Sequence, residues 1–413
     1  MLTYFLITTR HGSLLLYISP LRLGHLAILK YNEAKPNTRR RNLFGYILFF
    51  LSSLIVIILD LATSGEGGLG IFIGICAISG AFGIADAHVQ GGKVGDLSFM
   101  RPEFIHSFLA GLAASGAITS ALRLITKAAF ENSKDGLLKG AILFFSISSF
   151  FELLCVLLYA FAFPKLPIVK YYRSKAASEG SQTVSSDLAA GGIQALPRGA
   201  EEDPISLERL GNKKLLVQNI DYALDLFLTY VLTVSIFPGF LSEDTGKHSL
   251  GSWYALVLIA IYNVCDFIAR YIPPTKCLNL ESRKFLMIVI LARFLLVPAF
   301  YFTAKYGDQG WMIMLTSFLG LSNGYLPVCV LTCAPKGYRV SQLRKNNKLR
   351  FLFLFFKVQV KGFQLFMSLW FLQGLEQNAL GNLLVMFLLG GIFTGVAVAL
   401  DWSWLIGKRL VSS

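Results

Sequence analysis

Three polar side chains interrupt an apolar stretch in the second half of the sequence. Asn263, Asp266 and Arg270 lie within residues 258–274, where almost every other residue is hydrophobic. Spacings of three and four residues place them on one face of a helix, with Ile259 one turn earlier on that face. A carboxylate and a guanidinium are costly at membrane depth unless they pair or face water. The pattern therefore favours a polar cavity, in a pathway for a polar solute, over an ion pair that only ties helices together.

Residues 80–92 carry a second polar set at membrane depth. Asp86 and Gln90 are one helical turn apart and share a face, and His88 lies between them in sequence. One interpretation is a second wall of the solute site, in which Asp86 or His88 also carries a proton. The alternative is hydrogen bonding between helices. We favour that alternative for His88, and for Asp86 the two interpretations stand about even.

The composition indicates a helical membrane protein. The chain has 413 residues, of which 54% are hydrophobic and 15% are charged, whereas soluble domains carry about 25% charged residues. Several apolar runs reach the roughly 20 residues that a helix needs to cross a bilayer. The net charge of +14 comes from basic residues in short loops between these runs, so it favours membrane orientation over nucleic-acid binding.

No pattern of an enzyme or a metal site stands out. The motifs GxSxG, HExxH and GxxxxGK[ST] do not occur in a plausible context. The six cysteines lack CxxC spacing, which argues against a disulfide framework and a zinc site. We therefore predict neither catalysis nor a cofactor nor a bound metal.

The predicted membrane spans fall into two groups. They are residues 43–61, 69–90, 105–130 and 141–163, then 223–241, 252–272, 285–306, 311–332 and 380–406. Residues 1–31 make at best one poor span. Basic loops alternate with the others, which places residues 30–41 and 164–215 in the cytosol. Whether residues 351–374 cross the membrane, and hence on which side the C-terminus lies, stays open.

Two local interpretations concern positions within these spans. Gly111, Ser115 and Thr119 recur every four residues, and small residues at that spacing let two helix backbones approach closely. Asp221 and Asp225 are interpreted as acids at the start of a helix, where the helix dipole favours negative charge.

Several of these stretches together resemble one family. NVCDFIAR (263–270) resembles the N-x-x-D-x-x-x-R helix of equilibrative nucleoside transporters, and SNGYL (322–326) resembles the family's tenth helix. FGIADAHVQGG (82–92) and LARFLLVP (291–298) are similar to its fourth and ninth helices, the former in the plant branch especially. No single motif is specific, but the combination is.

The resemblance implies an all-α polytopic membrane protein, a major-facilitator-like bundle of two halves with about 10–11 transmembrane helices. It implies an N-terminal membrane half at 1–163, a flexible cytosolic linker at 164–215 and a C-terminal half at 216–413. The family's first helix has no counterpart in this sequence, and residues 339–374 form an atypical insert.

The resemblance also implies roles for individual residues. Asp266 and Arg270 would bind ribose hydroxyls, Asn263 would line the cavity, and Gln90 would contact the base, unless the alignment shifts to His88. An aromatic residue such as Tyr262 suits the apolar face of the solute. Asp86 or Asp266 would bind a proton if transport is proton-coupled.

The predicted function is transport of nucleosides, with nucleobases as further candidate solutes, by alternating access, either facilitative or proton-coupled. The alternatives are a non-transporting or truncated member of the family and a transporter of the same architecture for another polar solute. The expected location is the plasma membrane, and the expected partners are the nucleoside, the lipid bilayer and, with coupling, protons. The oligomeric state is left open.

Overall fold

A computed structural model describes twelve parts of the chain. They are residues 38–63, 69–98, 102–133, 135–178, 212–237, 241, 249–273, 280, 282–306, 308–337, 384 and 386–399. Residues 1–31 and 351–374, for which the sequence left the membrane crossing open, lie outside these parts.

Within the described residues, the regular elements are all helices. The first half holds α3 (Thr38–Thr63), α4 (Leu69–Ser98), α5 (Pro102–Phe130), α6 (Gly136–Leu157) and α7 (Pro167–Ser178). The second half holds α9 (Asn212–Ile236), α11 (Tyr254–Ala269), α12 (Arg283–Ala292), the short 3-10 turn η5 (Arg293–Leu295), α13 (Leu296–Tyr306) and α14 (Gln309–Gly337), with a final helix at Met386–Ala399. Eight of the described helical stretches are long and apolar enough to cross a membrane, and they coincide with the first eight predicted spans. The prediction of a polytopic helical membrane protein is confirmed.

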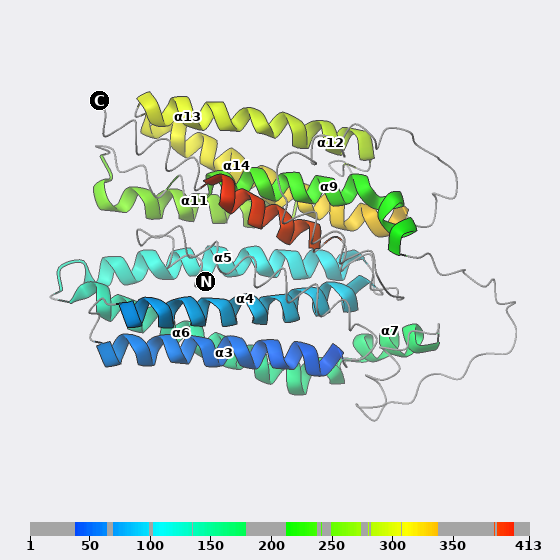
Figure 1. Cartoon of the computed structure of the whole chain (residues 1–413), viewed down its shortest axis with the longest axis horizontal. Coiled ribbons are helices and arrows are strands. Elements are labelled where there is room, and N and C mark those ends of the chain that lie inside the picture. Colours follow the sequence, from blue (N-terminus) through cyan, green and yellow to red (C-terminus); the bar gives the residue numbers. More distant parts are fainter. Residues whose placement is uncertain are drawn as a thin grey trace, which may run out of the picture.

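The helices form two groups that meet along α5 and α11. Figure 1 shows α3, α4, α5 and α6 on one side and α9, α11, α12, α13 and α14 on the other. The two groups contact each other mainly through α5 against α11, and to a smaller extent through α5 against α14. Any pathway between the halves is therefore bounded by these helices.

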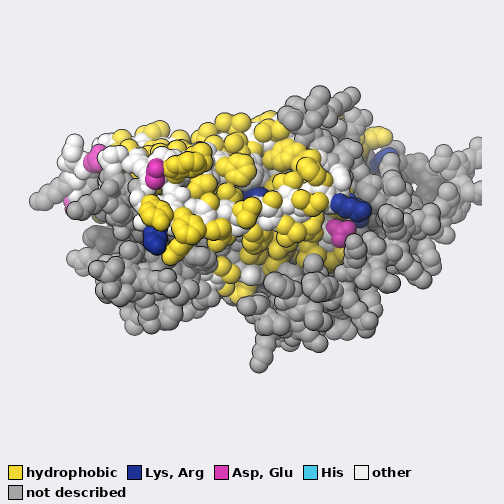
Figure 2. Space-filling model, turned by 90° about the horizontal axis from the view of Figure 1, so that it is seen from above, with side chains coloured by type: hydrophobic (Ala, Val, Ile, Leu, Met, Phe, Trp, Pro, Cys, Tyr) yellow, Lys and Arg dark blue, Asp and Glu magenta, His cyan; other side chains and the backbone are white. Residues whose placement is uncertain are grey.

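The outer surface is apolar over the width of a bilayer. Figure 2 shows hydrophobic side chains across the middle of one face, with most of the visible charged side chains toward its two ends. The exposed apolar residues on this part of the chain include Ile288, Leu291, Leu295, Phe302, Trp311, Met314 and Phe318. Such a belt is the surface that lipid chains cover.

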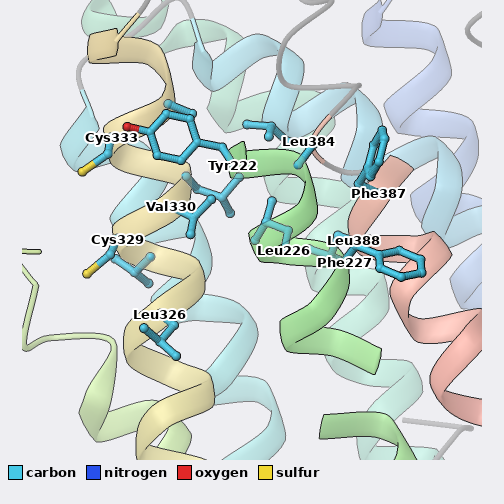
Figure 3. Close-up of a cluster of buried hydrophobic side chains, with 14 of the residues drawn as sticks. Tyr222, Leu226, Phe227, Leu326, Cys329, Val330, Cys333, Leu384, Phe387 and Leu388 are labelled. Carbon is cyan, nitrogen blue, oxygen red and sulfur yellow. The ribbon is translucent and has the colours of Figure 1, made fainter. Parts of the chain in front are cut away.

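The interior of the second half is packed by α9, α14 and the final helix. Figure 3 shows Tyr222, Leu226 and Phe227 of α9 beside Leu326 and Val330 of α14. Leu384, Phe387 and Leu388 complete this buried cluster from the C-terminal side. The described residues after the predicted insert therefore belong to the same core.

Two predictions about local structure need correction. Residues 164–215 were expected to be a flexible linker throughout, but Pro167–Ser178 forms helix α7. On α5, Gly111 and Ser115 are exposed, so they do not mediate a close helix contact. The face of α5 that approaches α11 is offset by one residue, and there Gly116 lies against the side chain of Asn263.

The closest helix contact around the predicted site is between α11 and α14. A Cβ added to Gly320 would lie 2.5 Å from the Tyr262 carbonyl oxygen, and one added to Gly324 would overlap the Asp266 carbonyl oxygen. Both carbonyls belong to the helix that carries the polar face. The two glycines therefore set how closely α14 approaches it.

Replacing Gly324 by alanine should destabilise the protein, because the new methyl group displaces α14 from the backbone of α11; overpacking of this kind costs about 1–3 kcal/mol. Gly111→Ala is the matched control, since nothing lies within 4 Å of the added Cβ and alanine is the better helix former. The measurement is the thermal unfolding midpoint of the purified protein in detergent. Equal midpoints for the two variants would contradict the packing argument.

Candidate functional site

The predicted polar face of α11 is buried between helices. Asn263, Asp266 and Arg270 are 7%, 5% and 7% exposed, while Val264 and Ile268 on the opposite face are exposed apolar residues. The helix is therefore oriented as the sequence pattern predicted, with its polar side inward and its apolar side outward. The polar face contacts α5 and α14.

Asp266 and Arg270 form an ion pair one helical turn apart. Nη2 of Arg270 lies 2.9 Å from Oδ2 of Asp266, and Nε donates to the same oxygen at 3.1 Å. The second carboxylate oxygen, Oδ1, accepts a hydrogen bond from Nδ2 of Asn323 at 2.8 Å. Both oxygens of the acid are thus satisfied, which is the condition for keeping a carboxylate at this depth.

Arg270 also connects the two halves of the molecule. Its Nη1 donates to the backbone carbonyl of Leu109 on α5 at 2.7 Å. About two turns earlier on α11, Nδ2 of Asn263 donates to Oγ of Ser120 on α5 at 2.8 Å, as well as to the Ile259 carbonyl. The residues singled out from the sequence therefore hold α5 and α11 together by two hydrogen bonds.

The network continues into the second half through residues that were not predicted as part of the site. Oγ1 of Thr233 on α9 donates to Oδ1 of Asn323 at 2.9 Å and accepts from Nη2 of Arg293 at 3.1 Å. Arg293 is 3% exposed, and its Nε and Nη1 have no hydrogen-bond partner among the described residues. Asn323 and Arg293 lie in the two motifs SNGYL and LARFLLVP, so attention to polar residues within those motifs would have identified them.

Tyr262 lies beside this network, with one ring face already occupied. Its ring stacks on Phe237 with a centroid distance of 3.8 Å and an interplanar angle of 19°. In this conformation that face is closed to a solute. A solute that stacks on Tyr262 has to replace Phe237 or use another surface of the ring.

The residues predicted on α4 do not all lie on one side of it. His88 is buried against α3, where its ring meets Phe44 at 5.0 Å between centroids, which agrees with a role in packing. Gln90 is half-buried and lies three residues after Ala87, which belongs to the core shared with the second half. Residues three apart share a face of a helix, so Gln90 lies toward the interface between the halves. Asp86 is half-buried, one turn before Gln90.

The interpretation of Asp221 and Asp225 as acids at a helix start is wrong for both residues. Helix α9 begins at Asn212 and has no acid in its first turn. Asp221 is exposed, whereas Asp225 is fully buried. The start of the helix was misplaced because the basic and polar residues before Asn219 are typical of a loop; in the structure they form a helix that bends at that residue.

Replacing Asn323 by valine should leave Oδ1 of Asp266 without its partner and so cost about 1–3 kcal/mol, the usual penalty for an unsatisfied buried polar group. Ser322→Ala is the neighbouring control, because the Ser322 hydroxyl bonds only the Leu319 carbonyl of its own helix. Denaturant unfolding in detergent micelles measures both. A loss no larger for Asn323→Val than for Ser322→Ala would show that the bond to Asp266 adds nothing.

Comparison with known proteins supports the resemblance seen in the motifs. The model of the nucleoside transporter family matches residues 73–360. The chain is 59% identical over 396 residues to equilibrative nucleotide transporter 3 of Arabidopsis thaliana, covering 96% of this chain and 86% of that protein. It is 57% identical over 396 residues to equilibrative nucleotide transporter 6 of the same plant, with the same coverage of both chains.

A more distant relative matches a shorter part of the chain. Equilibrative nucleotide transporter 1 of Arabidopsis thaliana is 32% identical over 304 residues, which are 71% of this chain and 63% of that protein. These similarities confirm the predicted family, its plant branch and the prediction of a transporter instead of an enzyme. Together with the buried ion pair and the membrane-length helices, they show that the chain is a multi-pass membrane protein that belongs to the nucleoside transporter family.

Proposed function

We propose that this protein carries nucleosides across a membrane by alternating access, with the Asp266–Arg270 pair at the centre of the solute site. The observation that carries the proposal is the placement of this pair: it is buried at membrane depth where α5, α11 and α14 meet. Ionised groups in such a position are retained for a solute pathway more often than for stability. Membership of the nucleoside transporter family supports the choice of solute.

A nucleoside has hydroxyl groups that can exchange for the present partners of the pair. A ribose hydroxyl can accept from Arg270 in place of the Leu109 carbonyl and donate to Asp266 in place of Asn323. These exchanges keep both buried charges satisfied, so binding leaves neither the carboxylate nor the guanidinium unpaired. Asn263 and Gln90 then supply amides for the remaining polar atoms, and Tyr262 supplies a ring for the apolar face of the solute.

Contacts at the opposite end of α5 hold the halves together on the outer side. Nζ of Lys127 donates to the carbonyl and to Oγ of Ser252 and lies 4.8 Å from the ring centre of Trp253. Nε1 of Trp253 donates to Oε1 of Glu131 at 3.0 Å. With Arg270 bonded to Leu109 toward the cytosolic end, the halves are joined on both sides of the site. We propose that the two sets of contacts break in turn as the site opens to each side.

A nucleotide is a second candidate solute, because the network has two basic residues, Arg270 and Arg293, and one acidic residue, Asp266. Asp266 balances Arg270, while Arg293 adds a buried guanidinium, two of whose nitrogens have no hydrogen-bond partner in the described part of the chain. A phosphate group would bond such nitrogens, and the names of the relatives refer to nucleotides. We favour nucleosides because the ion pair itself is neutral overall and suits an uncharged ribose.

The plasma membrane is the proposed location. We propose that the lipid bilayer is a partner that surrounds the apolar outer surface of the helices. A non-transporting family member and a carrier of another polar solute remain as distinct outcomes of the uptake experiment.

The test of function is uptake of radiolabelled uridine and adenosine into vesicles that contain the purified protein. We expect saturable uptake that unlabelled nucleosides inhibit and that glucose does not. Stronger inhibition by AMP than by adenosine would favour the nucleotide. Inhibition by glucose would indicate another solute, and lack of uptake by a correctly folded protein would indicate a non-transporting member.

Asp266→Asn and Arg270→Ala should abolish uptake without loss of surface expression, because each removes a charge that the ribose is proposed to contact. Asp135→Asn is the control: it removes the same charge as Asp266→Asn from an exposed loop position whose backbone φ of 68° asparagine also tolerates. Initial uptake rates and surface labelling are compared side by side. Normal uptake by both site variants would refute the site assignment.

Removing the outer contacts should favour opening toward the outside. Lys127→Ala combined with Trp253→Phe deletes the hydrogen bonds to Ser252 and Glu131, each worth about 0.5–1.5 kcal/mol. Because these bonds are proposed to form only in the closed state, their loss destabilises that state alone. Hydrogen–deuterium exchange around residues 126–131 and 250–256 should rise several-fold. Lys139→Ala is the control, because that lysine bonds Ser133 of the first half, and it should leave exchange in residues 250–256 unchanged. The same exchange in both variants would exclude a closing role for these contacts.

A further inference from the structure

Asp225 is a buried acid that has no role in the proposed solute site. Its side chain is fully buried in α9, six residues after the bend at Asn219. Neither carboxyl oxygen has a hydrogen-bond partner among the described residues. An ionised carboxylate in such a position costs several kcal/mol, so the structure accommodates Asp225 in its neutral, protonated form.

The elements packed against α9 offer no base that pairs with Asp225. Helix α12 contributes Arg283, which lies over the ring of Tyr222, 4.6 Å from its centre, instead of on the acid. Arg293 bonds Thr233, eight residues from Asp225 along α9. The remaining titratable groups on these elements and on α9 are Lys213, Lys214, Asp221, Tyr222, Tyr230, Lys284, Tyr301, Lys305, Tyr306, Tyr325, Cys329, Cys333 and Lys336. Among the described residues, none forms an ion pair or a hydrogen bond with the Asp225 carboxyl.

A stripe of polar residues leads from Asp225 to the central network. Thr229 follows one turn later, is 1% exposed, and its hydroxyl has no partner among the described residues. Thr233 follows after another turn and bonds Asn323, which bonds Asp266. Residues four apart lie on one face of a helix, about 6 Å apart along its axis. Thr229 and Thr233 therefore connect Asp225 along α9 to Asn323, which bonds Asp266 of the ion pair.

We propose that Asp225 is a proton-binding site that couples nucleoside transport to a proton gradient. This inference rests on the proposed transport function. In the closed conformation the carboxyl group holds one proton. When the second half opens toward the cytosol, water reaches the carboxyl group, the O–H bond breaks and the proton leaves to the cytosolic water, giving a carboxylate. After the empty site has turned to the outer side, the carboxylate takes up a proton there, so one proton enters with each solute.

The position of Asp225 along α9 fits release on the cytosolic side. The membrane-spanning part of α9 runs from Asn219 to Ile236, and the topology places its start at the cytosolic surface. Asp225 lies in the cytosolic half of this span, whereas Thr233, at the level of the central network, lies nearer its outer end. Water that enters when the cytosolic side opens can therefore reach the Asp225 carboxyl group. The two threonines lie between this carboxyl group and the central network.

The test uses Asp225→Asn, which keeps the shape of the protonated acid and removes the exchangeable proton. Asp221→Asn is the matched control, because Asp221 is one turn earlier on the same helix and exposed. Radiolabelled uridine is added to the solution outside vesicles whose interior is one pH unit more alkaline. The membrane potential is clamped to zero. One proton per solute supports accumulation up to about tenfold at a gradient of one unit.

We expect the wild type and Asp221→Asn to accumulate uridine above the outer concentration and Asp225→Asn only to equalise it. Exchange of labelled for unlabelled uridine, which needs no gradient, should persist in all three proteins. Accumulation by Asp225→Asn equal to that of the wild type would overturn the proposal. Uridine exchange by the wild type without any accumulation would also overturn it, while leaving the proposed transport function intact.

A second measurement keeps the proposal testable if uptake itself is absent. The unfolding midpoint of Asp225→Asn in detergent should match that of the wild type below about pH 4 and exceed it as the pH rises, because the unfolded wild type then releases a proton that the buried carboxyl group keeps. A variant that is much less stable than the wild type throughout this range would show that Asp225 is ionised and paired, and would refute the assignment. Asp221→Asn, which keeps the buried carboxyl group and removes only a neighbouring exposed charge, should still lose stability as the pH rises.

Discussion

The second half of the molecule is arranged around the need to satisfy two opposite charges away from water. Asp266 and Arg270 meet this need with each other, with an amide from α14 and with a backbone carbonyl from α5. Each partner comes from a different helix, so satisfying the pair also fixes how three helices meet. The glycines of α14 are required for the same reason, since only a helix without side chains at those positions approaches α11 closely enough for Asn323 to reach the acid.

The proposed solute site imposes a second requirement on the same residues. A solute site has to give up its internal hydrogen bonds without leaving a buried charge unpaired. The bonds from Arg270 to Leu109 and from Asn323 to Asp266 are of a kind that ribose hydroxyls replace one for one. Stability in the closed state and release in the open state then depend on the same few hydrogen bonds, which keeps the free-energy difference between the states small.

Much of the fold followed from hydrophobic runs and charge distribution, because these directly reflect the thickness of the bilayer and the cost of charge within it. The inward orientation of Asn263, Asp266 and Arg270 followed from helical periodicity in the same way. The partners of these residues did not follow, since Ser120, Thr233 and Asn323 lie far away in sequence and are ordinary in polarity. Asp225 was misjudged because the helix extends further toward the N-terminus than its apolar part, and hydropathy does not mark where a helix begins outside the membrane.

The nature of the acceptor on α5 affects how freely this helix can change. Arg270 binds the main-chain oxygen of residue 109, an atom that every amino acid provides. Mutational drift at that position alters the volume packed between the two halves and leaves the acceptor in place. Most single substitutions in α5 therefore leave the hydrogen bond between the halves in place. We expect changes in the strength of this bond to come mainly from substitutions of Arg270 or of the residues that hold its guanidinium.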